Sequence, residues 1–269
     1  MRKCVVNGIS IGGDSPVLMG VINCSCESFY TDSYIPTEKV HETAVAMVEQ
    51  GADLIDLGAR STAPNAQAIS GTEELSRIDK ALRELDGSGI TISVDTMNPW
   101  VLDACLKHEI HAVNDISGLA SPVFTQRIAE SGLPAFLMAT NCQPGDAIGV
   151  NATIAALYTI QQRCESAGID NYVLDPGIGI WTPLRSFSDN WELCRNFEMF
   201  QQFGRPVLAA ISRKSFIGNL LEREPADRLA GSIAVTMMLL EKGASVVRAH
   251  DVPETRDVIQ VYQRMKGDQ

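Results

Sequence analysis

The sequence predicts an α/β protein with the fold of a (β/α)8 TIM barrel, built as a single domain. Its length of 269 residues is close to the roughly 250 residues that are typical of one such barrel. Short apolar runs alternate along the chain with stretches of helical spacing, which is typical of parallel βαβ units. Each run closes on polar residues or a glycine, and in a parallel barrel these ends meet at one rim and form a pocket.

The predicted strands are the eight apolar runs, which we place at residues 17–22, 54–57, 90–94, 112–113, 135–138, 172–174, 207–211 and 246–247. Helices are expected between them. The first covers residues 37–50, because it follows Pro36 and ends at Gly51. The second begins with Thr72 as its N-cap and has two glutamates in its first turn. The remaining helices are predicted at residues 99–108, 121–131, 153–167, 189–203, 225–242 and 253–266.

The two ends of the predicted barrel differ. Within residues 1–15, the segment 3–11 is expected to form an N-terminal hairpin that caps the bottom of the barrel. Three long loops, at residues 24–36, 60–71 and 141–151, follow strands and therefore belong to the opposite rim. Long loops at that rim are usually lids or clamps, so we expect the functional site there.

Composition and charge exclude several classes of function. The formal net charge of −11 disfavours binding to nucleic acid or to an anionic membrane, which depends on basic patches. No apolar run approaches the roughly 20 residues of a membrane span, and no secretory signal is expected at the start. The seven cysteines are scattered and odd in number, which favours free thiols in a reducing compartment. We therefore expect a cytoplasmic protein that acts on small molecules.

Acidic and amide side chains end three of the predicted strands. Asp95, Asn114 and Asp175 would lie deep in the mouth of the barrel, where such groups need a partner or a ligand. A carboxylate accepts two parallel N–H bonds from a guanidine-like edge, so these groups suit a flat heterocycle with amine and lactam edges. The alternative is that they cap the following helices or hydrogen-bond a loop.

Basic side chains end the last two strands. Arg248 and His250 are two residues apart and face the same way on a strand, while Lys214 comes from the neighbouring strand. The loops after the seventh and eighth strands form the common phosphate site of these barrels. The sequence therefore predicts an anion site of three basic groups, against the alternative of solvated surface charges.

An asparagine ends the first strand. The amide oxygen of Asn23 is a hard ligand that suits Mg²⁺, which keeps several waters and bridges phosphate oxygens. The alternative is a turn-forming asparagine. Asp56 has the parity of an inward-pointing polar residue, and its role stays open. Residues 177–179 form only a lone G-x-G, so we reject a dinucleotide-binding loop.

In these segments the chain resembles the pterin-binding barrels, and among them the dihydropteroate synthases. The resemblance extends over almost the whole length. The segments that carry it lie at residues 19–23, 51–58, 61–62, 94–96, 114–117, 175–179, 212–218 and 248–252. Each is short, but their order and spacing together are specific.

The resemblance implies a role for each matching position. Its pterin-binding residues would be Asp95, Asn114, Asp175 and Lys214. Arg248 and His250 would hold the pyrophosphate, with Asn23 on its Mg²⁺, and Lys214, Arg248 and His250 would be catalytic. The arylamine site would be lined by Ser61, Thr62 and Ser215.

The implied reaction joins an aromatic amine, usually p-aminobenzoate, to (7,8-dihydropterin-6-yl)methyl diphosphate and releases pyrophosphate. The resemblance also implies a homodimer formed through late helices, to which residues 233–240 would contribute. Two alternatives stay open. One is a pterin-dependent corrinoid methyltransferase, although those barrels generally have asparagine in place of Lys214 and lack the Arg-x-His pair. The other is a pterin-binding protein without catalysis.

The chain departs from the family pattern mainly in its loops. Ser25, Cys26 and Glu27 stand where the family usually has Thr, Pro and Asp. Arg60 replaces a common glutamate, and Ala63 replaces an arginine. Further differences lie at residues 139 and 180–183. Because these changes touch the arylamine side, a modified arylamine that carries a phosphate facing Arg60 is a further hypothesis.

Overall fold

A parallel barrel forms the centre of the molecule. The computed structural model describes residues 1–25, 34–61 and 69–267. Its barrel strands are β3 (Val17–Asn23), β4 (Leu54–Gly58), β5 (Ile92–Asp95), β6 (Ala112–Asp115), β7 (Ala135–Met138), β8 (Tyr172–Asp175), β9 (Leu208–Ala209) and β10 (Val246–Ala249). They pair in the order β8-β7-β6-β5-β4-β3-β10-β9, and a parallel bridge between Leu174 and Val207 joins the two ends. The predicted (β/α)8 barrel is confirmed.

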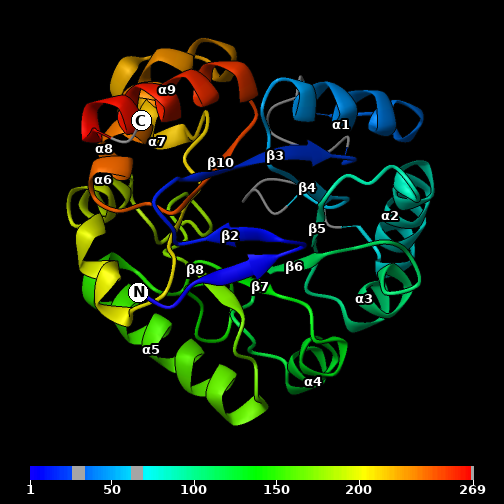
Figure 1. Cartoon of the computed structure of the whole chain (residues 1–269). Coiled ribbons are helices and arrows are strands. Elements are labelled where there is room, and N and C mark those ends of the chain that lie inside the picture. Colours follow the sequence, from blue (N-terminus) through cyan, green and yellow to red (C-terminus); the bar gives the residue numbers. More distant parts are fainter. Residues whose placement is uncertain (26–33, 62–68, 268–269) are drawn as a thin grey trace.

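Helices surround this barrel (Figure 1). They are α1 (Val40–Glu49), α2 (Gly71–Leu85), α3 (Pro99–Cys105), α4 (Pro122–Ser131), α5 (Gly149–Ala167), α6 (Phe187–Arg195), α7 (Ser215–Leu221), α8 (Leu229–Glu241) and α9 (Val252–Lys266). Short 3-10 turns lie at η2 (Thr37–Lys39), η3 (Phe197–Phe203) and η4 (Pro225–Asp227). No described helix is long and apolar enough to cross a membrane.

The structure corrects several predicted helix boundaries. Thr72 is not the N-cap of α2, because the Ser70 side chain accepts the hydrogen bond from the Glu73 amide and the helix begins at Gly71. The helix expected at 189–203 is divided at Asn196 into α6 and η3. The start of α5 lies four residues before the predicted one.

Helix α7 was not predicted. Immediately before it, Arg213 adopts a left-handed conformation with φ 55°, and Lys214 takes the N-cap position. The sharp turn allows the chain to enter a helix directly after β9. The segment expected as one helix at 225–242 therefore follows α7, and its α-helical part begins only at Leu229.

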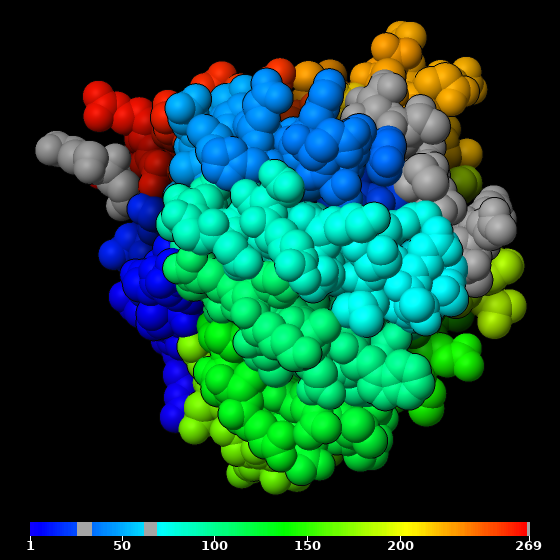
Figure 2. Space-filling view, turned by 90° about the vertical axis from the view of Figure 1, so that its right-hand side faces the viewer, coloured from blue at the N-terminus to red at the C-terminus, as the bar shows by residue number. Residues whose placement is uncertain are grey.

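An N-terminal hairpin fills the bottom of the barrel. Strands β1 (Cys4–Val6) and β2 (Ile9–Ile11) pair antiparallel across a two-residue turn, in which Asn7 and Gly8 have the positive φ angles that such turns need. Its buried side chains belong to a cluster inside the barrel that includes Met19, Phe136 and Leu208. The hairpin lies across the middle of the barrel in Figure 1 and at the left edge of the flank formed by α1–α4 in Figure 2. It leaves the carboxyl ends of the strands for the site.

Phe136 gives a test of this inner cluster. Its side chain is 1% exposed, so Phe136→Ala is expected to lower the free energy of unfolding by about 3–5 kcal/mol through lost burial and the cavity that remains. Denaturant titration measures this loss. The matched control is Phe187→Ala at the start of α6, where the side chain is 37% exposed and we expect a loss of about 1 kcal/mol or less. Equal losses would contradict the assignment of Phe136 to the core.

Candidate active site

The register of the strands brings the polar strand ends together. Asn23 pairs with Gly58 across β3 and β4, Gly58 with Asp95, and Asp95 with Asn114. On the other side of the mouth, Asp175 lies opposite Met138. These residues share one end of the barrel because all eight strands run parallel.

Asp56 is the centre of the acidic floor. Its Oδ2 accepts hydrogen bonds from Arg248 Nη1 at 2.7 Å and from Asn114 Nδ2 at 2.8 Å. Arg248 Nη1 also lies 3.6 Å from Asp95 Oδ2. The carboxylate is 2% exposed, and its Oδ1 has no hydrogen-bond partner among the described residues. Acidic and basic side chains thus lie in contact with one another in the mouth of the barrel.

The sequence left the role of Asp56 open. The available signal was a single carboxylate between Ile55 and Leu57 in an otherwise apolar strand. Such a charge needs a buried partner. Arg248, 192 residues away along the chain, is that partner, and sequence spacing does not indicate it.

The two cations of the mouth have different environments. Burial lowers the pKa of Arg248, but the carboxylates of Asp56 and Asp95 outweigh this and raise its pKa. Burial and the nearby Arg248 charge lower the pKa of Lys214 to about 7, although Asp175 opposes this. Arg248 therefore stays charged at neutral pH, whereas Lys214 is poised between its two forms.

The pKa values of two carboxylates in the mouth, Asp95 and Asp175, are also raised. Burial and the neighbouring Asp56 raise the pKa of Asp95 to about 7, against the opposing charges of Arg248 and Arg60. Burial raises the pKa of Asp175, against the charge of Lys214. Asp175 Oδ1 accepts the Gly177 amide at 2.7 Å, which orients the carboxylate. Strongly shifted groups that meet in a cleft are typical of functional sites.

His250 differs in charge from Arg248 and Lys214. Burial and the Arg248 charge lower its pKa to about 4, so the imidazole is neutral at pH 7. Its Nδ1 lies 3.2 Å from Ser212 Oγ at the end of the neighbouring strand. His250 lies at the mouth with the other two basic residues, and its ring is neutral because a buried imidazole beside a guanidinium gives up its proton.

Two of the long loops meet above the floor. The Ser61 amide donates to Ser25 Oγ at 3.0 Å, and the Ser25 amide donates to Asn23 Oδ1 at 3.0 Å. Ser215 is the first residue of α7, at the same rim. Thr62 lies outside the described residues, as do the substituted positions 26, 27 and 63.

Arg60 is directed towards α2. Its Nη1 lies 4.0 Å from Glu74 Oε2, and Glu74 accepts a hydrogen bond from Thr96 Oγ1 at 2.6 Å. The Glu74 carboxylate is buried and little screened by water, and at 4.0 Å it balances part of the Arg60 charge. Arg60 is also close enough to Asp95 to stabilise the charge of that carboxylate.

Asn23 is the candidate ligand for a magnesium ion. No group of three or more His, Cys, Asp or Glu side chains in residues 1–25, 34–61 and 69–267 is arranged to hold a metal. The amide oxygen of Asn23 is a hard donor at the rim. This donor fits an ion that keeps most of its waters and arrives with a diphosphate, rather than one held in a cage of side chains.

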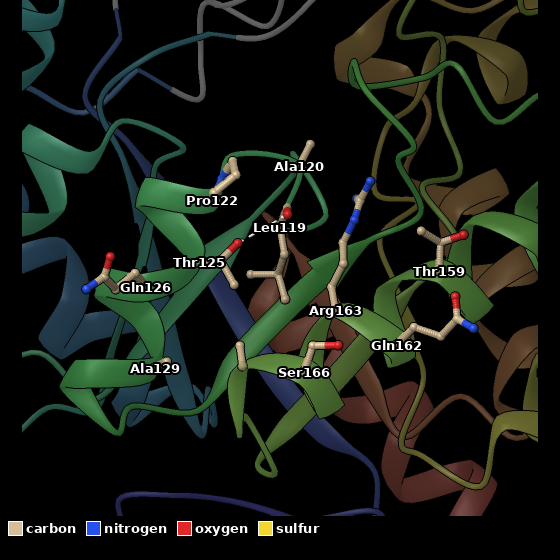
Figure 3. Close-up of a pocket in the computed structure, with 11 residues that line it drawn as sticks. Leu119, Ala120, Pro122, Thr125, Gln126, Ala129, Thr159, Gln162, Arg163 and Ser166 are labelled. Atoms are coloured by element: carbon tan, nitrogen blue, oxygen red, sulfur yellow. Dashed lines mark hydrogen bonds between the residues drawn. The ribbon is translucent and has the colours of Figure 1, made fainter.

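A groove of about 540 Å³ lies elsewhere, on the outer flank between α4 and α5 (Figure 3). Its lining includes none of the predicted site residues. Arg163 extends from this groove and donates to the carbonyls of Gly118 and Asn141, each at 2.7 Å. Arg163 thus ties together the loops that follow β6 and β7.

The sequence of this chain is similar to those of known pterin-binding enzymes. A family model described as "Pterin binding enzyme" matches residues 19–250. The chain is 35% identical to the dihydropteroate synthase of Escherichia coli K12 over an alignment of 275 residues. This alignment covers 97% of this chain and 95% of that protein. It is 32% identical to the Escherichia coli dihydropteroate synthase type-3, over 91% of this chain and 97% of that protein.

Solved structures agree. The Xanthomonas albilineans dihydropteroate synthase with 4-aminobenzoic acid superposes with a TM-score of 0.86 at 32% identity, over 98% of each chain. The Coxiella burnetii dihydropteroate synthase in complex with pteroic acid gives a TM-score of 0.87 at 28% identity, over 100% of each chain. The resemblance inferred from the motifs is confirmed, and the chain belongs to the pterin-binding enzyme family.

Proposed function

We propose that this protein joins an aromatic amine to (7,8-dihydropterin-6-yl)methyl diphosphate and releases pyrophosphate, as a dihydropteroate synthase does in folate biosynthesis. One observation carries the proposal. The Arg248 guanidinium lies 2.7 Å from Asp56 and 3.6 Å from Asp95, and the Lys214 amine is close enough to Asp175 for their charges to interact. Full-length similarity to dihydropteroate synthases supports the same reaction.

The proposed chemistry is a displacement at the methylene carbon. The bond from this carbon to the diphosphate oxygen breaks, a bond to the amine nitrogen forms, and the proton that the amine loses passes to water. Asp95, Asn114 and Asp175 would hold the amine and lactam edges of the pterin and favour its developing positive charge. Arg248 and His250 would receive the negative charge of the departing pyrophosphate, and Lys214 would orient the ring.

The state of His250 suits this role. A neutral imidazole beside Arg248 can donate one hydrogen bond to a phosphate oxygen, and it does not need to be protonated first. When the diphosphate brings negative charge into the mouth, the imidazolium becomes more stable. The protonated His250 would then donate a hydrogen bond to the departing pyrophosphate as the bond breaks.

We also propose that the reaction uses Mg²⁺, with Asn23 as the protein ligand. The ion would supply charge neutralisation on the phosphate oxygens. The amide oxygen of Asn23 at the end of β3 supports this assignment through its donor chemistry. The other groups around the diphosphate, Arg248 and His250, would bind it directly.

For the amine we propose p-aminobenzoate, bound beside Ser61, Thr62 and Ser215. The relative from Xanthomonas albilineans was solved with 4-aminobenzoic acid, which supports this choice. The alternative of a phosphate-bearing arylamine depended on Arg60 facing the ligand. The Glu74 carboxylate near Arg60 argues against that alternative, because it already offsets the arginine charge.

Two further proposals concern the whole protein. A homodimer through α8 and its neighbours is supported by apolar side chains at the surface, since Met238 on α8 is 61% exposed and Leu220 on α7 is 63% exposed. A cytoplasmic location is supported by the free thiols of the described cysteines, which are typical of a reducing compartment.

A pyrophosphate-release assay tests the reaction. The purified protein is incubated with the pterin diphosphate, Mg²⁺ and one of several amines, including p-aminobenzoate and a phosphate-bearing aminobenzene. We expect release that depends on the amine and is fastest with p-aminobenzoate. Tight binding of the pterin diphosphate in calorimetry without release on adding any amine would overturn the proposal and indicate a binding protein.

The pH dependence of kcat/KM for the pterin diphosphate gives a second test, because this ratio reports groups of the free enzyme. Below about pH 7 protonation removes the Asp95 carboxylate, and above about pH 7 deprotonation removes the Lys214 charge. A bell-shaped profile with its maximum near pH 7 is expected. In Asp95→Asn the acidic limb should weaken while the alkaline limb persists at lower activity. An unchanged acidic limb would assign it to another group.

A further inference from the structure

The segment that follows β8 surrounds the Lys214 amine. Lys214 Nζ donates to the carbonyl of Ile178 and lies 5.3 Å from the centroid of the Trp181 ring. An ammonium within about 6 Å of an indole face is attracted by the negative charge of that face. The lysine is thus held by a carbonyl and by an aromatic ring from the same short segment.

The indole itself has a fixed place. Trp181 Nε1 donates to the Gly177 carbonyl at 2.8 Å, and Arg185 Nη1 donates to the same oxygen at 2.6 Å. Arg185 Nη2 also donates to the Ala147 carbonyl at 3.0 Å, which joins this segment to the loop after β7. At Gly145 in that loop, a Cβ would collide with the Trp181 side chain. Two loops therefore pack around the ring.

Gly179 lies close to both the Lys214 amine and the Trp181 indole. A Cβ at this position would lie 2.9 Å from Lys214 Nζ and 3.3 Å from Trp181 Nε1. The backbone at Gly179, with φ 149°, the amine and the indole therefore converge at one point. A side chain at this position would crowd the amine and the indole, and the positive φ also favours glycine.

We propose that Trp181 is a positioning residue of this site, and that its indole ring holds the Lys214 ammonium in the mouth of the barrel beside Asp175. Trp181 stands in the segment where this chain departs from its family pattern. Its importance for catalysis rests on the proposed function, so the first test does not use the reaction.

The charged and titratable groups around Lys214 come from several elements. They are Asp175 of β8, Arg185 before α6, Cys194 of α6, Arg248 of β10 and His250 after it. Burial and Arg248 disfavour the ammonium, and the carboxylate favours it. Removal of the indole face is therefore expected to lower the titration midpoint of Lys214 by about 0.5 to 1 pH unit.

The test measures the pH dependence of acetylation of the Lys214 amine by acetic anhydride, read by mass spectrometry. In Trp181→Leu the midpoint should fall by about 0.5 to 1 pH unit, whereas Trp181→Phe should stay close to the parent protein because a ring face remains. Two controls are included, and neither midpoint should change. They are the acetylation midpoint of Lys242 in the same sample and that of Lys214 in the exposed Trp100→Leu variant. An unchanged midpoint in Trp181→Leu, or equal falls in both variants, would overturn the proposal.

A second measurement does not depend on how well Trp181→Leu folds. In a Trp100→Phe/Trp191→Phe protein, Trp181 is the remaining tryptophan. Its emission should change with pH at the midpoint found for Lys214, and adding Lys214→Met should abolish the step. A step that persists without the lysine would contradict the contact.

Kinetics then connect the contact to the reaction. The alkaline limb of kcat/KM should move in Trp181→Leu by the same amount as the acetylation midpoint. If the parent protein releases no pyrophosphate, the proposed function fails while the acetylation result still decides the role of Trp181. If release occurs and the limb does not move, Trp181 has no part in positioning the lysine for the reaction.

Discussion

Replacement of Arg248 by methionine is expected to lower kcat/KM about 1000-fold, the largest effect of any single substitution considered for this protein. The guanidinium would stabilise charge on the departing pyrophosphate, and an apolar side chain of similar length cannot. The steady-state rate of pyrophosphate release measures the loss. Arg248→Lys should recover only part of it, because an ammonium on a flexible stem lacks the planar set of donors with which a guanidinium binds phosphate oxygens.

The same substitution affects folding, which must be separated from catalysis. Without Arg248, Asp56 becomes a buried carboxylate with no cation, at a cost of about 3–5 kcal/mol. The double variant Asp56→Asn/Arg248→Met should regain most of this stability without regaining activity. Arg256→Met is the matched control, since Arg256 Nη2 pairs with Asp53 at 2.8 Å before the start of β4. If the double variant were as active as the parent, Arg248 would have no catalytic role.

Replacement of Asp175 by asparagine is expected to weaken binding of the pterin diphosphate about 100-fold. The carboxylate can accept two parallel N–H bonds from a guanidine-like edge, whereas an amide offers one acceptor and directs a donor at the same edge. Asparagine has almost the same shape and keeps an oxygen for the Gly177 amide, so the fold should persist. Calorimetry measures the affinity directly, without any requirement for turnover.

The control for Asp175 lies near the other end of the same strand. Asp170 precedes β8, its side chain is 81% exposed, and its contact is a surface ion pair with Arg2. Asp170→Asn should therefore leave the affinity unchanged. Should Asp175→Asn bind the pterin diphosphate as tightly as the parent protein, the pterin would have to lie elsewhere in the mouth.

Much of the fold followed from local pattern. The alternation of short apolar runs with helical stretches predicted all eight strands, because a parallel strand covered by helices is apolar along its length. Errors occurred where local chemistry competes. Ser70 and Thr72 are both good N-caps, and the Glu73 amide bonds to Ser70. Helix α7 was missed because its start depends on the left-handed turn at Arg213, which Asp251 and the Pro225 carbonyl hold in place from distant positions.

By itself, the sequence determined which residues stand at the rim. Asp95, Asn114, Asp175, Lys214, Arg248 and His250 all follow apolar runs, and parallel strands necessarily bring such positions to one end. Only the tertiary structure decided how these residues interact. It made Asp56 the partner of Arg248, gave His250 a neutral ring, brought Lys214 to a pKa of about 7, and placed Trp181 beside that lysine. The reason is physical: desolvation and charge coupling depend on distances between residues far apart in the chain, and those distances exist only once the barrel has closed.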